Sequence, residues 1–168
     1  MLQTDLSKVQ YYGGKNEKQN WQFRTYLKSL DKNEAEIDAI VHRVYADVIK
    51  QIDCTQCANC CMKIRPIAAR DDICSISKHL HLPEDKFISQ YLGLNEDQEY
   101  LMAKIPCPFL KDKRCSIYEV RPEDCRSFPH IWKNGFVTRL MGTLNNYSIC
   151  PIVFNVYEQL KSEFKYNA

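Results

Sequence analysis

The chain has 168 residues, a formal net charge of +2, 45% hydrophobic residues and 26% charged residues. This length suits one domain with a sizeable core, and a charge so near neutral predicts neither a nucleic-acid partner nor a membrane surface. No apolar run approaches the roughly 20 residues that cross a bilayer.

Nine cysteines are the unusual feature of the composition. The first residues lack the pattern of a secretory signal, so we expect a cytoplasmic protein. In that compartment thiols stay reduced, and clustered cysteines bind metal more often than they form disulfides. A disulfide scaffold and unrelated buried cysteines are the alternatives.

The N-terminal part of the chain predicts a lead-in and then a long helix. Residues 1–20 are polar and contain Gly13-Gly14, so we expect them to be partly ordered, with a short helix at 21–30. Apolar residues recur with helical period from Ile37 to Ile52, which predicts a helix from about Glu34 to about Asp53. We therefore divide the chain into a lead-in, 1–34, and a cysteine-bearing domain, 35–168.

The next stretch, Cys54-Thr-Gln-Cys57-Ala-Asn-Cys60-Cys61, has the spacing C-x2-C-x2-C-C. Two-residue gaps allow cysteines to surround one ion or one cluster. Because Cys60 and Cys61 are adjacent, we expect their side chains to point in different directions. One of the two would then serve a second metal or a second corner of a cluster.

The segments after this stretch predict short elements. We expect an extended segment at 63–67, helices at 71–79 and 83–92, the second ended by Gly93, and a strand at 100–103. A turn at 112–113, a short helix from Pro122, a strand at 136–140 and a last helix from Cys150-Pro151 follow. The predicted fold is mainly α, with irregular cysteine-bearing loops and at most a small β element, in one compact metal-binding domain.

The cysteines can be sorted by their surroundings. Cys74 lies beside apolar residues in a predicted helix, and we expect it to be a small buried side chain. Eight thiolates remain, which suits two four-cysteine sites holding either zinc or iron–sulfur clusters. The unequal gaps are unlike a zinc ribbon, so iron is preferred to zinc. The predicted ligands are Cys54, Cys57, Cys60, Cys61, Cys107, Cys115, Cys125 and Cys150.

Several motifs in order resemble the CxxCxxCC, or YkgJ-type, cysteine-cluster family over about residues 50–160. They are the 54–61 stretch, Pro106-Cys107-Pro108-Phe109-Leu110, Cys115-Ser-Ile-Tyr118, Arg121-Pro122-x2-Cys125-Arg126 and Cys150-Pro151. The resemblance implies chelation of zinc or iron by the eight cysteines, with Cys74 outside the pattern. A relative of this domain occurs in a flagellin lysine methylase associated with an iron–sulfur cluster, which supports the preference for iron.

Three other side chains lie near these cysteines. Arg121 and Arg126 flank Cys125, where a guanidinium either offsets the charge of about −2 on a four-thiolate site or pairs with a neighbouring acid. His130 is expected to be structural or exposed, because eight cysteines already fill two sites.

Three functions fit the sequence. The preferred one is an iron or iron–sulfur protein in electron transfer or another redox reaction, acting with an unidentified redox partner. The alternatives are a structural zinc module that binds a protein, and an enzyme whose metal keeps an open position for a substrate. No catalytic residue can be assigned. Metal binding should couple to folding, so Cys57→Ser is expected to lose metal and stability together.

Overall fold

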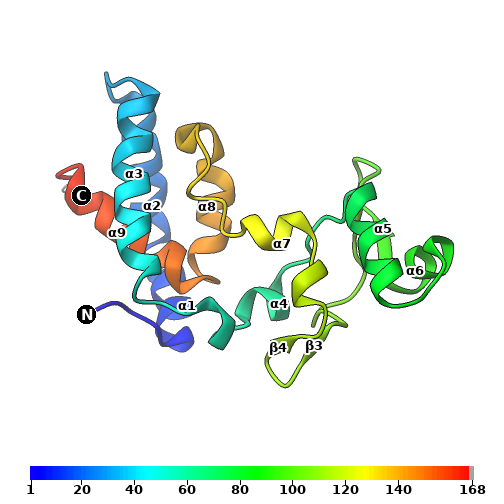
Figure 1. Cartoon of the computed structure of the whole chain (residues 1–168). Coiled ribbons are helices and arrows are strands. Elements are labelled where there is room, and N and C mark those ends of the chain that lie inside the picture. Colours follow the sequence, from blue (N-terminus) through cyan, green and yellow to red (C-terminus); the bar gives the residue numbers. More distant parts are fainter. Residues whose placement is uncertain (167–168) are drawn as a thin grey trace. The chain divides into compact units, whose positions relative to one another are not determined.

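The structure is a computed structural model that describes residues 1–166 (Figure 1). Over these residues it contains nine α-helices and two antiparallel sheets of two short strands each, which confirms the mainly α prediction. The chain forms two compact units. Unit 1 comprises Met1–Asp53 and the chain from Pro129 onward, and unit 2 comprises Cys54–Phe128. The boundary at 34/35 stays a prediction.

Unit 1 is organised around its last helix, α9 (Pro151–Glu163), which lies against α3 (Glu34–Ile49) and α8 (Leu140–Tyr147). Helices α1 (Leu6–Lys15) and α2 (Glu17–Ser29) complete the unit. Aromatic rings join them to α9: Phe23 meets Tyr157 edge-on at 5.2 Å, and Tyr12 lies 6.0 Å from Phe154. The predicted final helix is therefore confirmed, and it forms the core of this unit.

A buried charge on α9 is satisfied by its neighbours. Lys161 is only 6% exposed, and its Nζ lies 2.6 Å from Glu158 Oε1 and 3.1 Å from Gln19 Oε1. Tyr147 of α8 donates to the same Glu158 oxygen at 2.7 Å. Because a buried charge is tolerated only when it is paired and hydrogen-bonded, this network fixes α2, α8 and α9 in one arrangement.

The predicted lead-in at 1–20 is wrong, because α1 begins at Leu6 and α2 at Glu17. The Asp5 carboxylate accepts hydrogen bonds from the amides of Ser7 at 2.8 Å and Lys8 at 3.2 Å, which caps the helix start. Val9 is fully buried. Tertiary packing thus overrides the low helix propensity of the glycine pair.

Two other predicted boundaries differ in unit 1. Helix α3 is confirmed but ends at Ile49, earlier than the expected Asp53. The strand expected at 136–140 is wrong: Phe136–Arg139 is a 3-10 helix. Its cause is Asp38, 7% exposed, whose carboxylate accepts from the amides of Gly135 at 2.7 Å and Phe136 at 3.0 Å. These bonds hold the segment in a turn that an extended strand could not form.

Unit 2 contains short elements connected by loops. A 3-10 helix at Cys54–Gln56 and α4 (Asn59–Lys63) carry the first four cysteines. Helices α5 (Arg70–His79) and α6 (Glu84–Tyr91) follow as predicted, and then β1 (Leu92–Leu94) and β2 (Tyr100–Met102). The last elements are β3 (Leu110–Lys111), β4 (Arg114–Cys115), a 3-10 helix at Tyr118–Val120 and α7 (Glu123–Ser127).

The strands of unit 2 pair in two hairpins. Strand β1 pairs with β2, with Leu92 opposite Met102, so Gly93 lies in a strand and does not cap α6 as predicted. Strand β3 pairs with β4, with Leu110 opposite Cys115. The predicted strand at 100–103, the turn at 112–113 and the short helix after Pro122 are confirmed.

The core of unit 2 is small and lies beside two of the predicted ligands. Partly buried Cys107 and Cys115 pack against this core. Its buried residues come from α5, α6, both hairpins and the loops that connect them: Ala68, Ile73, Ile76, Phe87, Leu92, Met102, Phe109 and Ile117. The apolar core therefore supports the segments that carry these thiols.

Candidate metal centre

Four cysteines from separate segments of unit 2 form one group, which we call the thiol cluster: Cys61 of α4, Cys107, Cys115 of β4 and Cys125 of α7. Charge repulsion from neighbouring thiolates raises the pKa of Cys107, Cys115 and Cys125. Cys61 acts on all three, Cys115 acts on Cys107 and Cys125, and Cys107 acts on Cys125. All six pairs interact in this way. Four mutually neighbouring thiols match the donor set of a tetrathiolate site.

Backbone hydrogen bonds hold two of these segments together. The Cys107 amide donates to the Cys61 carbonyl at 2.8 Å, and the Ser116 amide donates to the Phe109 carbonyl at 2.8 Å. The first bond places the Cys107 loop beside α4. The second closes the β3–β4 hairpin, which brings Cys115 back toward the same loop.

Two carboxylates fix the helix that carries Cys125. Asp72, only 5% exposed, accepts hydrogen bonds from the amides of Ala69 and Glu123, each at 3.0 Å. Asp124 accepts from the Ile67 amide at 3.0 Å. These bonds tie α7 to the start of α5, so the acidic pair at 71–72 contributes through Asp72 to the placement of Cys125.

Burial and crowding keep the thiols protonated when no cation is present. Burial is the largest cause that raises the pKa of Cys107 and Cys115, and it raises that of Cys125 to about 12, with the neighbouring thiolates adding to the effect. A hydrogen bond with the Cys60 thiol is the largest cause of the raised pKa of Cys61. A metal that binds here must therefore displace protons.

Backbone amides near two of the sulfurs lower the pKa of these thiols. The amides of Phe109 and Leu110 act on Cys107, whose carbonyl accepts from the Leu110 amide at 3.0 Å, and the Ile117 amide acts on Cys115. Amide hydrogen bonds to a sulfur stabilise its thiolate form. The turns after both cysteines thus partly offset the cost of burial, as a thiolate ligand requires.

The adjacent cysteines lie on one short helix. Both Cys60 and Cys61 belong to α4, where successive side chains are separated by about 100° around the axis. This spacing agrees with the expectation that the two side chains point in different directions. The Cys60 thiol still lies near enough to raise the pKa of Cys61.

The donor set fits zinc or iron, although its thiols lie farther apart than bound ligands do. As they stand, no three His, Cys, Asp or Glu side chains within residues 1–166 are placed to hold one metal ion. Binding would have to move the sulfurs inward as their protons leave.

The other predicted ligands belong to other segments of the chain. Cys54, which is exposed, and Cys57 occupy the turn before α4. Cys150 is buried in unit 1, where it caps the start of α9. Their role as ligands stays a prediction. Cys74 is partly exposed on α5, and is therefore less buried than expected.

The two arginines near Cys125 differ in their partners. Arg126 pairs with Glu123 at 2.9 Å and with Asp72 at 3.4 Å. Of the two roles considered for it, pairing with acidic residues is therefore the one that the structure supports. Arg121 instead stacks on the Tyr118 ring at 3.7 Å and donates to the Tyr118 carbonyl. Its charge lowers the pKa of Cys115, as expected for a guanidinium that offsets the negative charge of a thiolate site.

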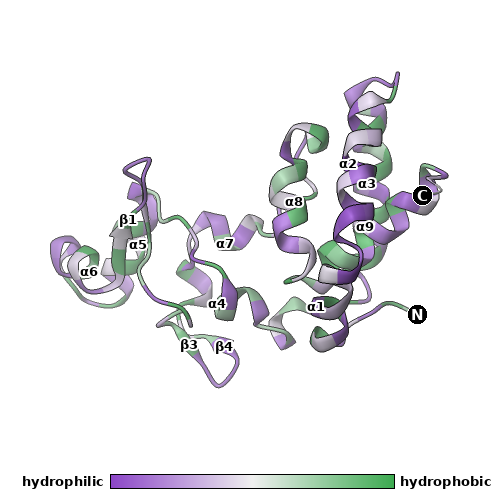
Figure 2. Cartoon of the chain, turned by 180° about the vertical axis from the view of Figure 1, so that it is seen from behind, coloured by the Kyte–Doolittle hydropathy of each residue, from purple (hydrophilic) through white to green (hydrophobic). Residues whose placement is uncertain are grey.

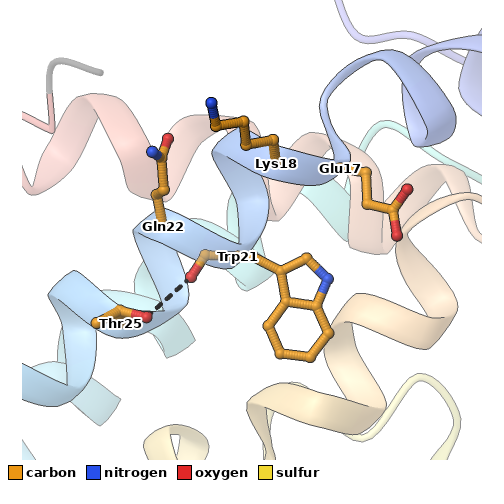
Figure 3. Close-up of a pocket in the computed structure, with 5 residues that line it drawn as sticks. All are labelled: Glu17, Lys18, Trp21, Gln22 and Thr25. Carbon is orange, nitrogen blue, oxygen red and sulfur yellow. Dashed lines mark hydrogen bonds between the residues drawn. The ribbon is translucent and has the colours of Figure 1, made fainter.

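A shallow hollow occurs elsewhere, along α2 in unit 1 (Figure 3). Within it, Thr25 Oγ1 donates to the Trp21 carbonyl at 3.1 Å. Its lining comes from one helix: Glu17, Lys18, Trp21, Gln22 and Thr25. Because no cysteine or histidine lines it, this hollow offers no soft metal ligand, and the thiol cluster remains the candidate centre.

Comparison with known families identifies the chain. Residues 53–151 match the CxxCxxCC family, described as a proposed zinc- or iron-chelating domain, and the chain belongs to this family. The match spans every predicted ligand from Cys54 to Cys150. The function that follows at this level is chelation of zinc or iron.

An uncharacterised protein of Methanocaldococcus jannaschii is 31% identical over 81 residues, which cover 46% of this chain and 43% of the relative. The chain thus spans less than half the length of the curated relative that it matches. No solved structure matches the chain. Among the helices of residues 1–166, none has both the length and the apolarity needed to cross a membrane.

Proposed function

We propose that the thiol cluster binds iron, either as an ion or as an iron–sulfur cluster, and that the protein serves in electron transfer or another redox reaction. The observation that carries the proposal is the convergence of Cys61, Cys107, Cys115 and Cys125 from four segments onto one half-buried group. Without a cation the thiolates of such a group would repel one another, so a bound metal ion explains the grouping best.

The residues around the cluster suit a redox centre. The amides of Phe109, Leu110 and Ile117 lie near the sulfurs and lower the pKa of Cys107 and Cys115, and hydrogen bonds to sulfur together with solvent exposure set the potential of such sites. Iron supplies the change of one electron, and the protein supplies the donors, the amides and a partly dry surrounding. A reducing compartment such as the cytoplasm, the predicted location, would keep the thiols available.

A structural zinc centre is the second candidate, favoured by the small core of unit 2. Its strands are two or three residues long, and short elements around a small core often need a metal to fold. Four thiolates also leave no open position, as in structural zinc sites. An enzyme would need a metal with three protein ligands and a free position.

Anaerobic purification, a UV–visible spectrum and elemental analysis separate these candidates. A brown protein that absorbs near roughly 400 nm and contains iron and acid-labile sulfide supports the cluster. Iron without sulfide supports a thiolate-bound ion. A colourless protein with stoichiometric zinc supports the structural module, and a protein without either metal contradicts both proposals.

A further inference from the structure

Charge is unevenly distributed over unit 2. The unit contains eleven Lys or Arg and eleven Asp or Glu, so it is neutral overall. Residues 60–66 and 104–121, which surround Cys61, Cys107 and Cys115, contain seven basic and two acidic residues. Residues 70–99, which include α5, α6 and β1, contain three basic and seven acidic residues. The candidate metal centre therefore lies at the basic end of the unit.

We call six of these seven basic side chains the basic rim. None of the six forms an ion pair within residues 1–166, in contrast to Arg126 nearby. Their charge is thus available to a partner. They are Lys63, Lys104, Lys111, Lys113, Arg114 and Arg121.

The rim surrounds the thiol cluster because its members lie on the same segments as the cysteines. Lys63 ends α4, two residues after Cys61, and the Cys107 amide bonds to the Cys61 carbonyl. Lys111 and Arg114 are paired across the β3–β4 hairpin, next to the Leu110–Cys115 pair. Both views place this hairpin beside α4, with α5 and α6 on the other side of the unit, and its tip is strongly hydrophilic (Figures 1 and 2).

Exposed apolar side chains lie among these cations. Met62 and Ile105, adjacent or close to Cys61 and Cys107, are 42% and 48% exposed. Tyr118 is 42% exposed, but the Arg121 guanidinium covers one face of its ring. Single-stranded nucleic acid is bound through open aromatic faces, whereas Met, Tyr and Arg are typical of protein interfaces. The mixture fits a protein better than RNA.

We propose that the basic rim, with Met62 and Ile105, is the surface on which an acidic protein partner docks over the thiol cluster. Opposite charges steer such a partner to the correct face and speed the encounter. The apolar side chains then contribute contact area at the centre. The inference rests on the proposed function for its purpose, because a half-buried redox centre needs a partner that approaches it closely.

The test uses a fluorescently labelled peptide of alternating Glu and Leu as the acidic probe, and a Glu–Ser peptide of the same charge as its control. Binding to the full chain is followed by fluorescence anisotropy at low and high KCl. The rim variant is Lys111→Glu/Arg114→Glu. The matched control, Lys78→Glu/Lys86→Glu, makes charge reversals on α5 and α6, away from the rim.

The proposal predicts that Glu–Leu binds at low salt, that the rim variant loses at least tenfold in affinity, and that the control variant stays within twofold of the native protein. Met62→Ser/Ile105→Ser should weaken Glu–Leu binding while leaving its salt dependence unchanged. Circular dichroism of each variant verifies folding. Equal losses in both charge variants, equal binding of the two peptides, or binding of single-stranded RNA in place of either peptide would overturn the proposal.

Metal analysis of the same samples separates this inference from the proposed function. Rim-dependent peptide binding by a protein that carries neither iron nor zinc would contradict the metal centre and leave the docking surface supported. A fully metal-loaded protein whose peptide binding ignores the rim would contradict the docking surface alone.

Discussion

Arg121 shows how one side chain can act on the thiol cluster without binding metal. It has no carboxylate partner within residues 1–166, it is held on Tyr118 at 3.7 Å, and its charge acts on Cys115. Since four thiolates around a divalent ion leave about −2, a nearby cation stabilises the loaded site. Arg126, one turn beyond, is already neutralised by Glu123 and Asp72.

We therefore expect Arg121→Gln to weaken metal affinity about tenfold, which corresponds to about 1.4 kcal/mol. Arg121→Lys should keep most of the affinity, because it keeps the charge. Competition with a chelator of known affinity measures the change. Arg126→Gln is the matched control and should lower the melting temperature with little effect on affinity. The same loss of affinity in both Gln variants would show that Arg121 acts only on stability.

The Cys125 thiol makes the metal-free protein sensitive to alkali. Burial and neighbouring thiolates raise its folded-state pKa to about 12, against an ordinary value near 9. Below pH 9 the thiol is protonated in both states, and its contribution is fully present. Above pH 9 the unfolded chain ionises first, so stability falls by about 1.4 kcal/mol per pH unit for this group. Urea unfolding of the reduced, metal-free protein at pH 8, 9 and 10 measures the slope.

Cys125→Ser provides the control for this slope, because serine does not ionise in the range. The variant should lose part of the alkaline destabilisation, while Cys74→Ser should retain all of it. A slope that is identical in native protein and Cys125→Ser would contradict the assigned cause.

Among the elements, α1 depends on a glycine at one position. A Cβ at Gly13 would overlap Ser148 Cβ and lie 3.1 Å from Ser148 Cα, whereas a Cβ at Gly14 would meet nothing within 4 Å. Gly13→Ala should cost about 1–3 kcal/mol through overpacking. Gly14→Ala should stabilise by about 0.5–1 kcal/mol, because alanine favours the helix. Chemical denaturation of both variants measures the difference, and equal effects would argue against this packing.

The same glycine pair explains why α1 could not be predicted. Local sequence indicates a partly ordered lead-in, and only the contact of Gly13 with a residue 135 positions away gives this glycine a structural role. Similarly, the 136–140 segment has strand character, but Asp38 binds its amides from almost 100 residues away. Helices α3, α5, α6 and α9 were predictable, because their periodicity or capping residues are local.

Cysteine spacing predicted eight candidate ligands but not how they are divided between metal sites. The sequence gives eight candidates with unequal gaps, and nothing local indicates which four meet. Hydrogen bonds between distant segments, from Cys107 to Cys61 and from Glu123 to Asp72, bring together the segments that carry Cys61, Cys107, Cys115 and Cys125. The basic rim was also not predicted, because its residues come from segments that are separate in the sequence, and residues 112–113 were expected only to form a turn.

For the whole molecule, the two units should respond differently to loss of metal. Unit 1 has a large apolar core centred on α9, whereas unit 2 has a small core and short strands beside the thiols. Metal removal should therefore speed amide hydrogen exchange in residues 54–128 by at least tenfold, with little change in α3 and α9. Hydrogen-exchange mass spectrometry of loaded and metal-free protein measures this. Uniform exchange changes in both units would contradict the expected difference.

The central claim is that Cys61, Cys107, Cys115 and Cys125 hold one metal centre. Metal content per folded chain in Cys125→Ser, compared with Cys74→Ser, tests it most directly. We predict that Cys125→Ser loses one full centre, with Cys115→Ser losing the same amount, while Cys74→Ser keeps native content. Native metal content in folded Cys125→Ser and Cys115→Ser would contradict the claim.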